Sequence, residues 1–176
     1  MLGVIRPTTE IVGKLSKTKH IGVLGTTGTV VSNSYPIEIE KFFPKAKVFQ
    51  EACPIWVPLI ENNEFENVGA DFFVNKNIGN LLKKNKKIDT IILGCTHYPL
   101  LLKKIKKYLP KGIKLISQGE IVANSLSDYF KRHPAMEKKC SKGREIEFYT
   151  TDSCYNFDES ATIFFGKSVQ SKHISL

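Results

Sequence analysis

Apolar residues along the chain form short runs separated by longer amphipathic segments. The runs at residues 20–24 (HIGVL) and 89–93 (DTIIL) are typical of buried strands, and residues 47–52 and 113–116 have the pattern of two further strands. The segments between them have the spacing of helices that bury one face. This alternation predicts an α/β fold with an open, mostly parallel sheet and flanking helices.

The helical segments are bounded by proline or by a change of composition. Pro44 ends the segment that follows the first strand, and Pro36 inside it predicts a kink or a late start. Residues 131–142 are charged and are expected to form a loop. Helices are predicted over residues 10–15, from residue 30 to 43, and over residues 70–84, 100–109 and 121–130.

The C-terminal segment carries its own boundary signals. A strand is expected over residues 145–151, and residues 168–176 are expected to form an edge strand. Asn156 and Glu159 have the spacing of a capping box at the start of a helix. Gly166 is a suitable residue to end that helix, because glycine adopts the left-handed conformation at little cost.

Composition places the chain among soluble globular proteins. It has 176 residues, 41% hydrophobic and 24% charged, which suits one domain or slightly more. No apolar run approaches the ~20 residues of a membrane-spanning helix, and the N-terminus lacks the pattern of a signal peptide. The four cysteines contain no C-x-x-C pair, so a zinc site is not expected. A disulfide framework is not expected either, because the chain shows no export signal and has enough apolar residues to form a core. We therefore expect a cytoplasmic location.

The net charge of +9 raises the question of a nucleic-acid partner. Much of it lies in two lysine clusters within residues 83–87 and 103–107. A phosphate-binding surface would use such clusters, but Arg, which binds phosphates and bases in bidentate fashion, contributes only 3 of the 26 basic residues. The second cluster also alternates with apolar residues on one helix. The pattern favours solvated helix faces and no nucleic-acid partner.

Two loops after predicted strands have compositions that suit ligand binding. In parallel sheets, ligands bind beyond the carboxyl ends of the strands. The first loop, Gly25-Thr26-Thr27-Gly28-Thr29, offers glycines, hydroxyls and a helix N-terminus that suit a carboxylate or phosphate. It lacks the dinucleotide and Walker patterns, and an ordinary turn with a helix cap explains it equally well.

The second loop is Gly94-Cys95-Thr96-His97-Tyr98-Pro99. Cys95 ends a buried strand, and Pro99 is suited to the first turn of the next helix. A thiol near a helix N-terminus has its thiolate favoured and acts as a base or nucleophile. His97 titrates in the right range to exchange a proton with it. A buried structural cysteine beside a histidine in a turn is the alternative.

The second loop belongs to a set of motifs that resembles the glutamate racemases. G-C-T-H-Y-P-L at 94–100 is similar to the second catalytic-cysteine motif of that family. Four further motifs occur in the family's order, so the resemblance covers essentially the whole chain. They are G-V-I-R-P at 3–7, G-V-L-G-T-x-G-T-V at 22–30, E-A-C-P-I-W-V-P-L-I-E at 51–61 and F-Y-T-T-D-S at 148–153.

The resemblance implies cofactor-independent racemisation of glutamate, which supplies D-glutamate for peptidoglycan and cell-wall synthesis. Without a cofactor or metal, one group must remove the α-proton from one face and another must return it from the opposite face. Preorganised donors and a water-poor pocket must stabilise the carbanion. The resemblance assigns the acid/base thiol to Cys95, its assistants to His97 and Glu61, and substrate contacts to Thr96, His97, Thr26 and Thr29. An exposed helix carboxylate is the alternative for Glu61, and Cys53 is interpreted as packing.

The sequence departs from the family in one large respect. The first thiol of the family lies in a C-N-T motif beside a D-S-G substrate loop, and residues 1–176 contain neither motif; Cys140 and Cys154 lie in unrelated contexts. We therefore expect a C-terminal portion of a racemase that is poorly active or inactive alone. Its expected organisation is a linking segment at 1–20, an α/β lobe at 21–118, and residues 119–176 returning to an N-terminal lobe.

Partners and rival functions stay open at this point. Glutamate is the expected small-molecule ligand, and no membrane partner is expected. A homodimer and a separate N-terminal lobe both remain open. A related aspartate or amino-acid racemase would share the scaffold, and a basic nucleic-acid-binding module is the alternative from another class.

Overall fold

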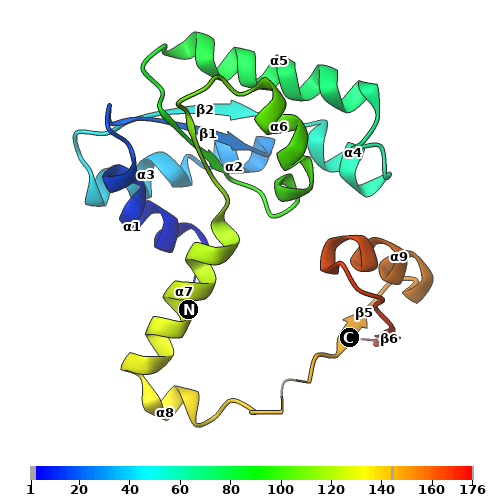
Figure 1. Cartoon of the computed structure of the whole chain (residues 1–176). Helices are drawn as coiled ribbons and strands as arrows, with labels where there is room; N and C mark the ends of the chain where they lie inside the picture. The colour runs from blue at the N-terminus through cyan, green and yellow to red at the C-terminus, as the bar shows by residue number, and fades with distance from the viewer. Residues whose placement is uncertain (1–2, 144, 176) are drawn as a thin grey trace. The chain divides into compact units, whose positions relative to one another are not determined.

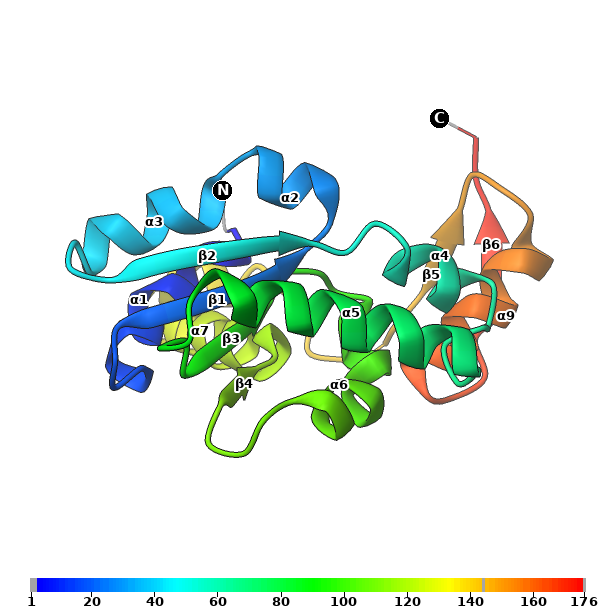
Figure 2. The ribbon, with the colours of Figure 1, turned by 90° about the horizontal axis from the view of Figure 1, so that it is seen from above.

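The computed structural model contains the predicted parallel sheet. Its four strands are β1 (His20–Gly25), β2 (Lys47–Ala52), β3 (Thr90–Leu93) and β4 (Lys114–Ile116), in the order β2-β1-β3-β4. Every neighbouring pair is parallel, with Gly22 opposite both Phe49 and Ile91. Figure 2 shows the strands side by side in this order. The α/β fold class is confirmed.

The structure describes residues 3–143 and 145–175, which fall into two compact units. The first ends at Tyr129 and contains this four-stranded sheet. The second begins at Phe130 and contains a two-stranded parallel sheet of its own. The boundary between the two units lies inside the helix that spans residues 118–132.

Helices connect the strands of the first unit and cover both faces of its sheet. In Figure 1, α5 lies above the strands, and α1 and α3 lie below them. Across the described parts of the chain, no helix is long and apolar enough to cross a membrane. The helices are α1 (Ile5–Leu15), α2 (Thr27–Val31), α3 (Ser34–Phe42), α4 (Trp56–Glu61), α5 (Val68–Lys84), α6 (Leu102–Tyr108), which follows the 3-10 turn η1 (Tyr98–Leu101), and α7 (Gln118–Arg132), which extends past the boundary.

Side chains that alternate along the strands build one core on each face of the sheet. Leu24, Ile91 and Leu93 pack with the inner faces of α5 and α6, together with the fully buried Trp56. The residues that point the other way, among them Val23, pack with α1 and α3. A strand that is buried on both faces has a nearly continuous apolar sequence, which is why these runs were recognisable.

The segment between the first two strands forms two helices, and the second starts just before Pro36, in accord with the predicted late start. The helix breaks at Asn33, whose φ of 53° is left-handed, and Pro36 lies inside α3 without ending it. Proline is tolerated there because the first turn of a helix has no internal partner for its backbone nitrogen. The short helix α4 was not predicted, since its apolar residues are too few to show a period.

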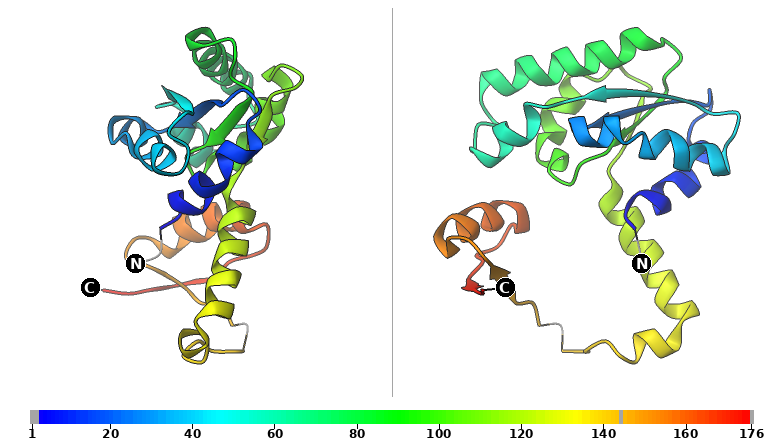
Figure 3. Two further views of the ribbon diagram at one scale, coloured as in Figure 1. Left: turned by 90° about the vertical axis from the view of Figure 1, so that its left-hand side faces the viewer. Right: turned by 180° about the vertical axis from the view of Figure 1, so that it is seen from behind.

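The second unit contains α8 (Pro134–Glu137), β5 (Phe148–Thr150), α9 (Cys154–Phe165) and β6 (Ser171–His173). Figure 3 shows α9 beside the two strands. The loop predicted at 131–142 is wrong in part, because α7 continues to Arg132 and α8 follows. The capping box is also wrong: Ser153 caps α9, and its hydroxyl accepts a hydrogen bond from the backbone N–H of Asn156 at 3.4 Å. Gly166 ends the helix with φ 73°, as predicted.

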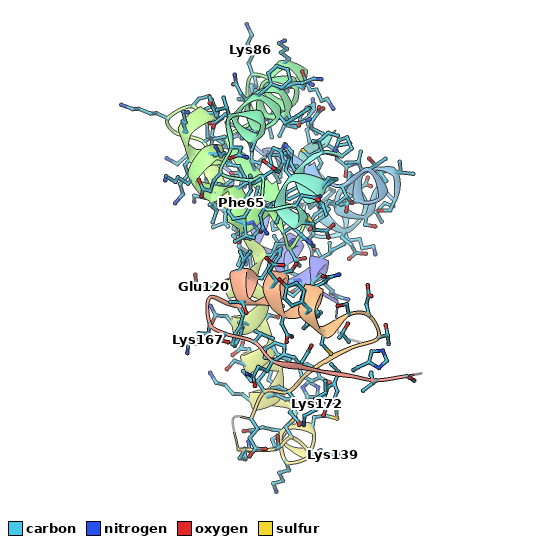
Figure 4. The ribbon with its side chains drawn as sticks, turned by 90° about the vertical axis from the view of Figure 1, so that its right-hand side faces the viewer. Phe65, Lys86, Glu120, Lys139, Lys167 and Lys172 are labelled. Carbon is cyan, nitrogen blue, oxygen red and sulfur yellow. The ribbon has the colours of Figure 1, made fainter. Side chains whose placement is uncertain are left out.

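The lysine clusters lie mainly on solvated surfaces, with one exception. Lys86 projects away from the ribbon (Figure 4). Lys104 is only 8% exposed, and its ammonium donates to the carbonyls of Glu66 and Asn67 and to the carboxylate of Asp71. This lysine therefore joins α6 to the start of α5, which the charge pattern alone did not indicate.

Candidate active site

The loops that follow β1, β2 and β3 meet at the carboxyl edge of the first unit's sheet. Backbone hydrogen bonds hold them in register there. The N–H of Gly94 donates to the carbonyl of Leu24 at 2.8 Å, and the N–H of Cys53 donates to the carbonyl of Gly25 at 2.8 Å. β1 lies between β2 and β3, so the loops that follow the three strands leave the sheet at the same edge. Residues far apart in sequence are thereby gathered at one edge.

Cys95 lies two residues beyond the end of β3, in the turn that leads to η1. Its side chain is partly buried. The N–H of Tyr98 donates to the Cys95 carbonyl at 3.3 Å, and Pro99 lies in the first turn of η1 as predicted. The buried strand and the Tyr98 ring, which is fully buried against Trp56, fix the two ends of this turn.

Cys95, His97 and Glu61 form a continuous chain of contacts. The Cys95 Sγ lies 3.8 Å from Nδ1 of His97, and Nε2 of His97 lies 3.2 Å from Oε1 of Glu61. Glu61 is the last residue of α4, so this contact joins the loops after β2 and β3. The His97 side chain is 28% exposed and that of Glu61 is 57% exposed, which leaves the chain open to solvent at its carboxylate end.

The protonation of Cys95 differs from the sequence expectation. Burial raises the pKa of the thiol, and the nearby negative charge of Glu61 raises it further. The backbone N–H groups of His97 and Tyr98 act in the opposite direction but do not outweigh burial. η1 is a short 3-10 turn, so its N-terminus supplies little of the field of a full helix. Cys95 is therefore a thiol at neutral pH.

The three threonines that were predicted to bind substrate lie in two separate segments of the chain. Thr26 caps α2: its Oγ1 accepts a hydrogen bond from the N–H of Thr29 at 3.2 Å and lies 2.9 Å from Oγ1 of Thr29. The pair therefore lies at the end of β1, the strand next to β3. Thr96 is exposed in the turn between Cys95 and His97.

Cys53 is buried among apolar side chains, in accord with its interpretation as packing. Burial raises its pKa strongly, and its Sγ donates to the Glu51 carbonyl at 3.7 Å. Cys140 is exposed and Cys154 begins α9, both in the second unit. Cys95 lies beside a histidine, His97.

Two residues near Cys95 were missed by sequence reasoning. The ring of Tyr35, 1% exposed, packs behind Gly94, and Gln118 at the start of α7 donates to the carbonyl of Leu93. Gln118 follows β4 and lies at the same edge as the predicted loops. Ligands of parallel sheets bind beyond the carboxyl ends of the strands, and this holds for the loop after β4 as well as for those after β1 and β3. Gln118 was therefore predictable as a candidate from its position after β4.

The fold and the site together define an α/β protein in which a thiol, an imidazole and a carboxylate contact one another in a row at the edge of a parallel sheet. This arrangement can move a proton between sulfur and nitrogen while the carboxylate orients the imidazole. Among residues 3–143 and 145–175, no group of three His, Cys, Asp or Glu side chains is arranged to hold a metal ion.

Comparison with known proteins identifies the chain's relatives. The glutamate racemase of Lactiplantibacillus plantarum is 34% identical over 177 residues, which is 100% of this chain and 64% of that protein. A crystal structure of a glutamate racemase isoform from Bacillus anthracis superimposes with a TM-score of 0.87 at 32% identity, over 99% of this chain and 64% of that one. No protein-family model matches the chain.

A second solved structure gives the same result. The glutamate racemase of Francisella tularensis, crystallised in complex with D-glutamate, superimposes with a TM-score of 0.84 at 27% identity. It is covered over 62% of its length by 98% of this chain. The chain is a homologue of the glutamate racemases, and it spans about 64% of the length of the curated relatives it matches.

Proposed function

We propose that this chain carries one of the two acid/base groups of glutamate racemisation, and that the group is the thiol of Cys95. The observation that carries the proposal is the contact chain from the Cys95 sulfur through His97 to Glu61, in a homologue of the glutamate racemases. Racemisation reverses one stereocentre, so a proton leaves one face and another arrives at the opposite face. Cys95 serves one of these faces.

His97 and Glu61 prepare Cys95 for proton transfer. A thiol whose pKa is raised by burial is a suitable proton donor but needs a base to become a thiolate. Nδ1 of His97 is the nearest such base, at 3.8 Å. Glu61 accepts from Nε2 and thereby favours the tautomer whose Nδ1 is the acceptor for the thiol proton. No metal or cofactor takes part in this step.

The hydroxyls of the site hold the substrate. On this proposal, Thr96 beside Cys95, and Thr26 with Thr29 at the end of β1, bind the carboxylate and amino groups of glutamate. The product, D-glutamate, would supply peptidoglycan synthesis in the cytoplasm. Residues 21–118 form the catalytic lobe and residues 119–176 contact a second lobe.

The second thiol is the component that residues 1–176 do not offer. The C-N-T and D-S-G motifs are absent from them, and Cys140 and Cys154 lack comparable surroundings. The chain by itself is therefore expected to convert L- to D-glutamate poorly or not at all. When the segment of a relative that has no counterpart in this chain is supplied in trans, both faces are served and racemisation is restored.

The test follows the α-hydrogen of each enantiomer of glutamate in D2O by proton NMR, with and without that segment. Racemisation by the mixture is expected, and Cys95→Ser abolishes it, whereas the matched control Cys140→Ser retains it. Activity that survives Cys95→Ser, or a folded mixture without exchange of either enantiomer, would refute the role of Cys95. Full turnover by residues 1–176 alone would refute the need for a second lobe.

A further inference from the structure

The side chain of Gln118 is joined to the strand that carries Cys95. Its Nε2 donates a hydrogen bond to the backbone carbonyl of Leu93 at 3.0 Å. Leu93 is the last residue of β3 and lies two residues before Cys95, so the bond holds the strand where it turns into the active-site loop. Gln118 is also the first residue of α7, and the same bond ties the start of that helix to β3.

The chemistry of the amide fixes which way Gln118 points. A carbonyl accepts hydrogen bonds and does not donate them, so the NH2 side of the amide must face Leu93. The opposite atom, Oε1 of Gln118, is buried and has no hydrogen-bond partner among the described residues. A buried acceptor without a partner is costly. The amide therefore keeps the orientation that makes the hydrogen bond to Leu93, although its Oε1 has no described partner.

Tyr35 closes the space behind the same loop. A Cβ placed on Gly94 would lie 3.1 Å from Cε2 of the Tyr35 ring and 3.2 Å from the carbonyl oxygen of Leu24. Burial raises the pKa of Tyr35 to about 12, although the Gln118 side chain lowers it. The tyrosine therefore stays neutral, and its ring forms a rigid wall against which Gly94 is packed.

We propose that Gln118 is a positioning residue for the Cys95 thiol. It holds the Leu93 carbonyl while Tyr35 packs against Gly94, and the two contacts fix the turn from which Cys95 projects. The same turn sets the positions of the backbone N–H groups of His97 and Tyr98, which stabilise the thiolate form of Cys95. The relevance to catalysis rests on the proposed role of Cys95, but the positioning itself is measurable without turnover.

The test measures how fast Cys95 reacts with iodoacetamide as a function of pH. Peptide mass spectrometry reads each cysteine separately, with Cys140 and Cys154 as internal references. Gln118→Met keeps the side-chain length but removes the donor. It is expected to raise the midpoint of the Cys95 profile and to slow alkylation at pH 8 by about threefold or more, because the thiolate loses aligned N–H groups.

A second glutamine provides a matched control. Gln50 on β2 also donates to a backbone carbonyl, that of Val30 at 3.4 Å, and also has a buried Oε1 without a described partner. Gln50→Met should leave the Cys95 profile unchanged. Gln118→Asn, which keeps the amide but is too short to reach Leu93, should repeat the effect and serves if Gln118→Met does not fold.

Two results would overturn the inference. One is a folded Gln118 variant whose Cys95 profile matches the wild type. The other is an equal shift in Gln50→Met, which would indicate a general loosening of the sheet. Both are independent of the α-hydrogen exchange assay, so a failed positioning role and a failed racemase proposal are distinguishable.

Discussion

Asp89 offers the sharpest test of how the first unit is held together. Its carboxylate accepts hydrogen bonds from the hydroxyl of Ser16 at 2.6 Å and from the backbone N–H groups of Lys17 and Thr18, both at 2.8 Å. Thr90 adds a fourth at 3.0 Å. One side chain at the start of β3 thus anchors the loop that connects α1 to β1. We predict that Asp89→Asn destabilises the fold in a pH-dependent way.

The magnitude follows from the pKa of the group. Burial alone would raise it, but the hydrogen bonds from Ser16, Thr18, Thr90 and Lys17 outweigh burial and hold the pKa at about 2. Against an ordinary value near ~3.9, this corresponds to about 2.5 kcal/mol of stability. The figure is an upper bound, because Asp89 is partly exposed and solvent screens the interaction.

The sign of the pH dependence follows from the depressed pKa. A carboxylate with a lower pKa in the folded state stabilises the protein above the unfolded-state pKa and loses that effect as the pH falls through the folded-state value. The contribution of Asp89 is therefore complete above pH ~4 and fades toward pH ~2. The difference in unfolding free energy between wild type and Asp89→Asn should shrink over that window.

Urea unfolding followed by tryptophan fluorescence measures this difference. Trp56 is the one tryptophan of the chain and is fully buried in the first unit, so it reports on the unit that contains Asp89. Glu10→Gln is the control, because Glu10 pairs with Arg6 on the exposed surface of α1. A difference that stays constant from pH 7 to pH 2 would refute the assignment, as would an equal effect in Glu10→Gln.

Two further predictions concern packing and a buried ion pair. Gly13→Ala places a Cβ 2.2 Å from Cγ of Phe43 and should destabilise the fold by about 1–3 kcal/mol in the same urea assay. Gly79→Ala has nothing within 4 Å of the new Cβ and should stabilise α5 by up to ~1 kcal/mol. Equal effects of the two variants would contradict the close packing of Gly13 against Phe43. Lys104→Met breaks a buried pair and should cost about 3 kcal/mol. Lys107→Met, at the exposed side of the same carboxylate, should have a much smaller effect, because solvent screens that pair. Similar losses in the two lysine variants would count against the buried role of Lys104.

The strands and the loop at residues 94–99 were predictable because the sequence signals for them lie within a few neighbouring residues. A strand covered on both faces must be apolar along its length, and β1 and β3 show this directly. The place of Cys95 after such a strand could be read from the sequence, and its acid/base role was assigned by the resemblance to the glutamate racemases. Pro36 predicted a break in the segment after β1, but its position at Asn33 and the cap at Ser153 were not predictable, because several nearby residues can serve at similar free energy.

The sequence by itself determined the α/β fold class, most of the strands and helices, and the loop that holds Cys95 and His97. The resemblance had already named Glu61, but only the tertiary structure showed that it meets the loop through His97, and that Gln118 meets the strand end at Leu93. It also decided that burial raises the pKa of Cys95, against the expectation from its position before a helix. The physical reason is the same for each. Strand and helix signals depend on neighbours in sequence, whereas a long-range contact or a desolvated thiol depends on which elements the fold packs around it.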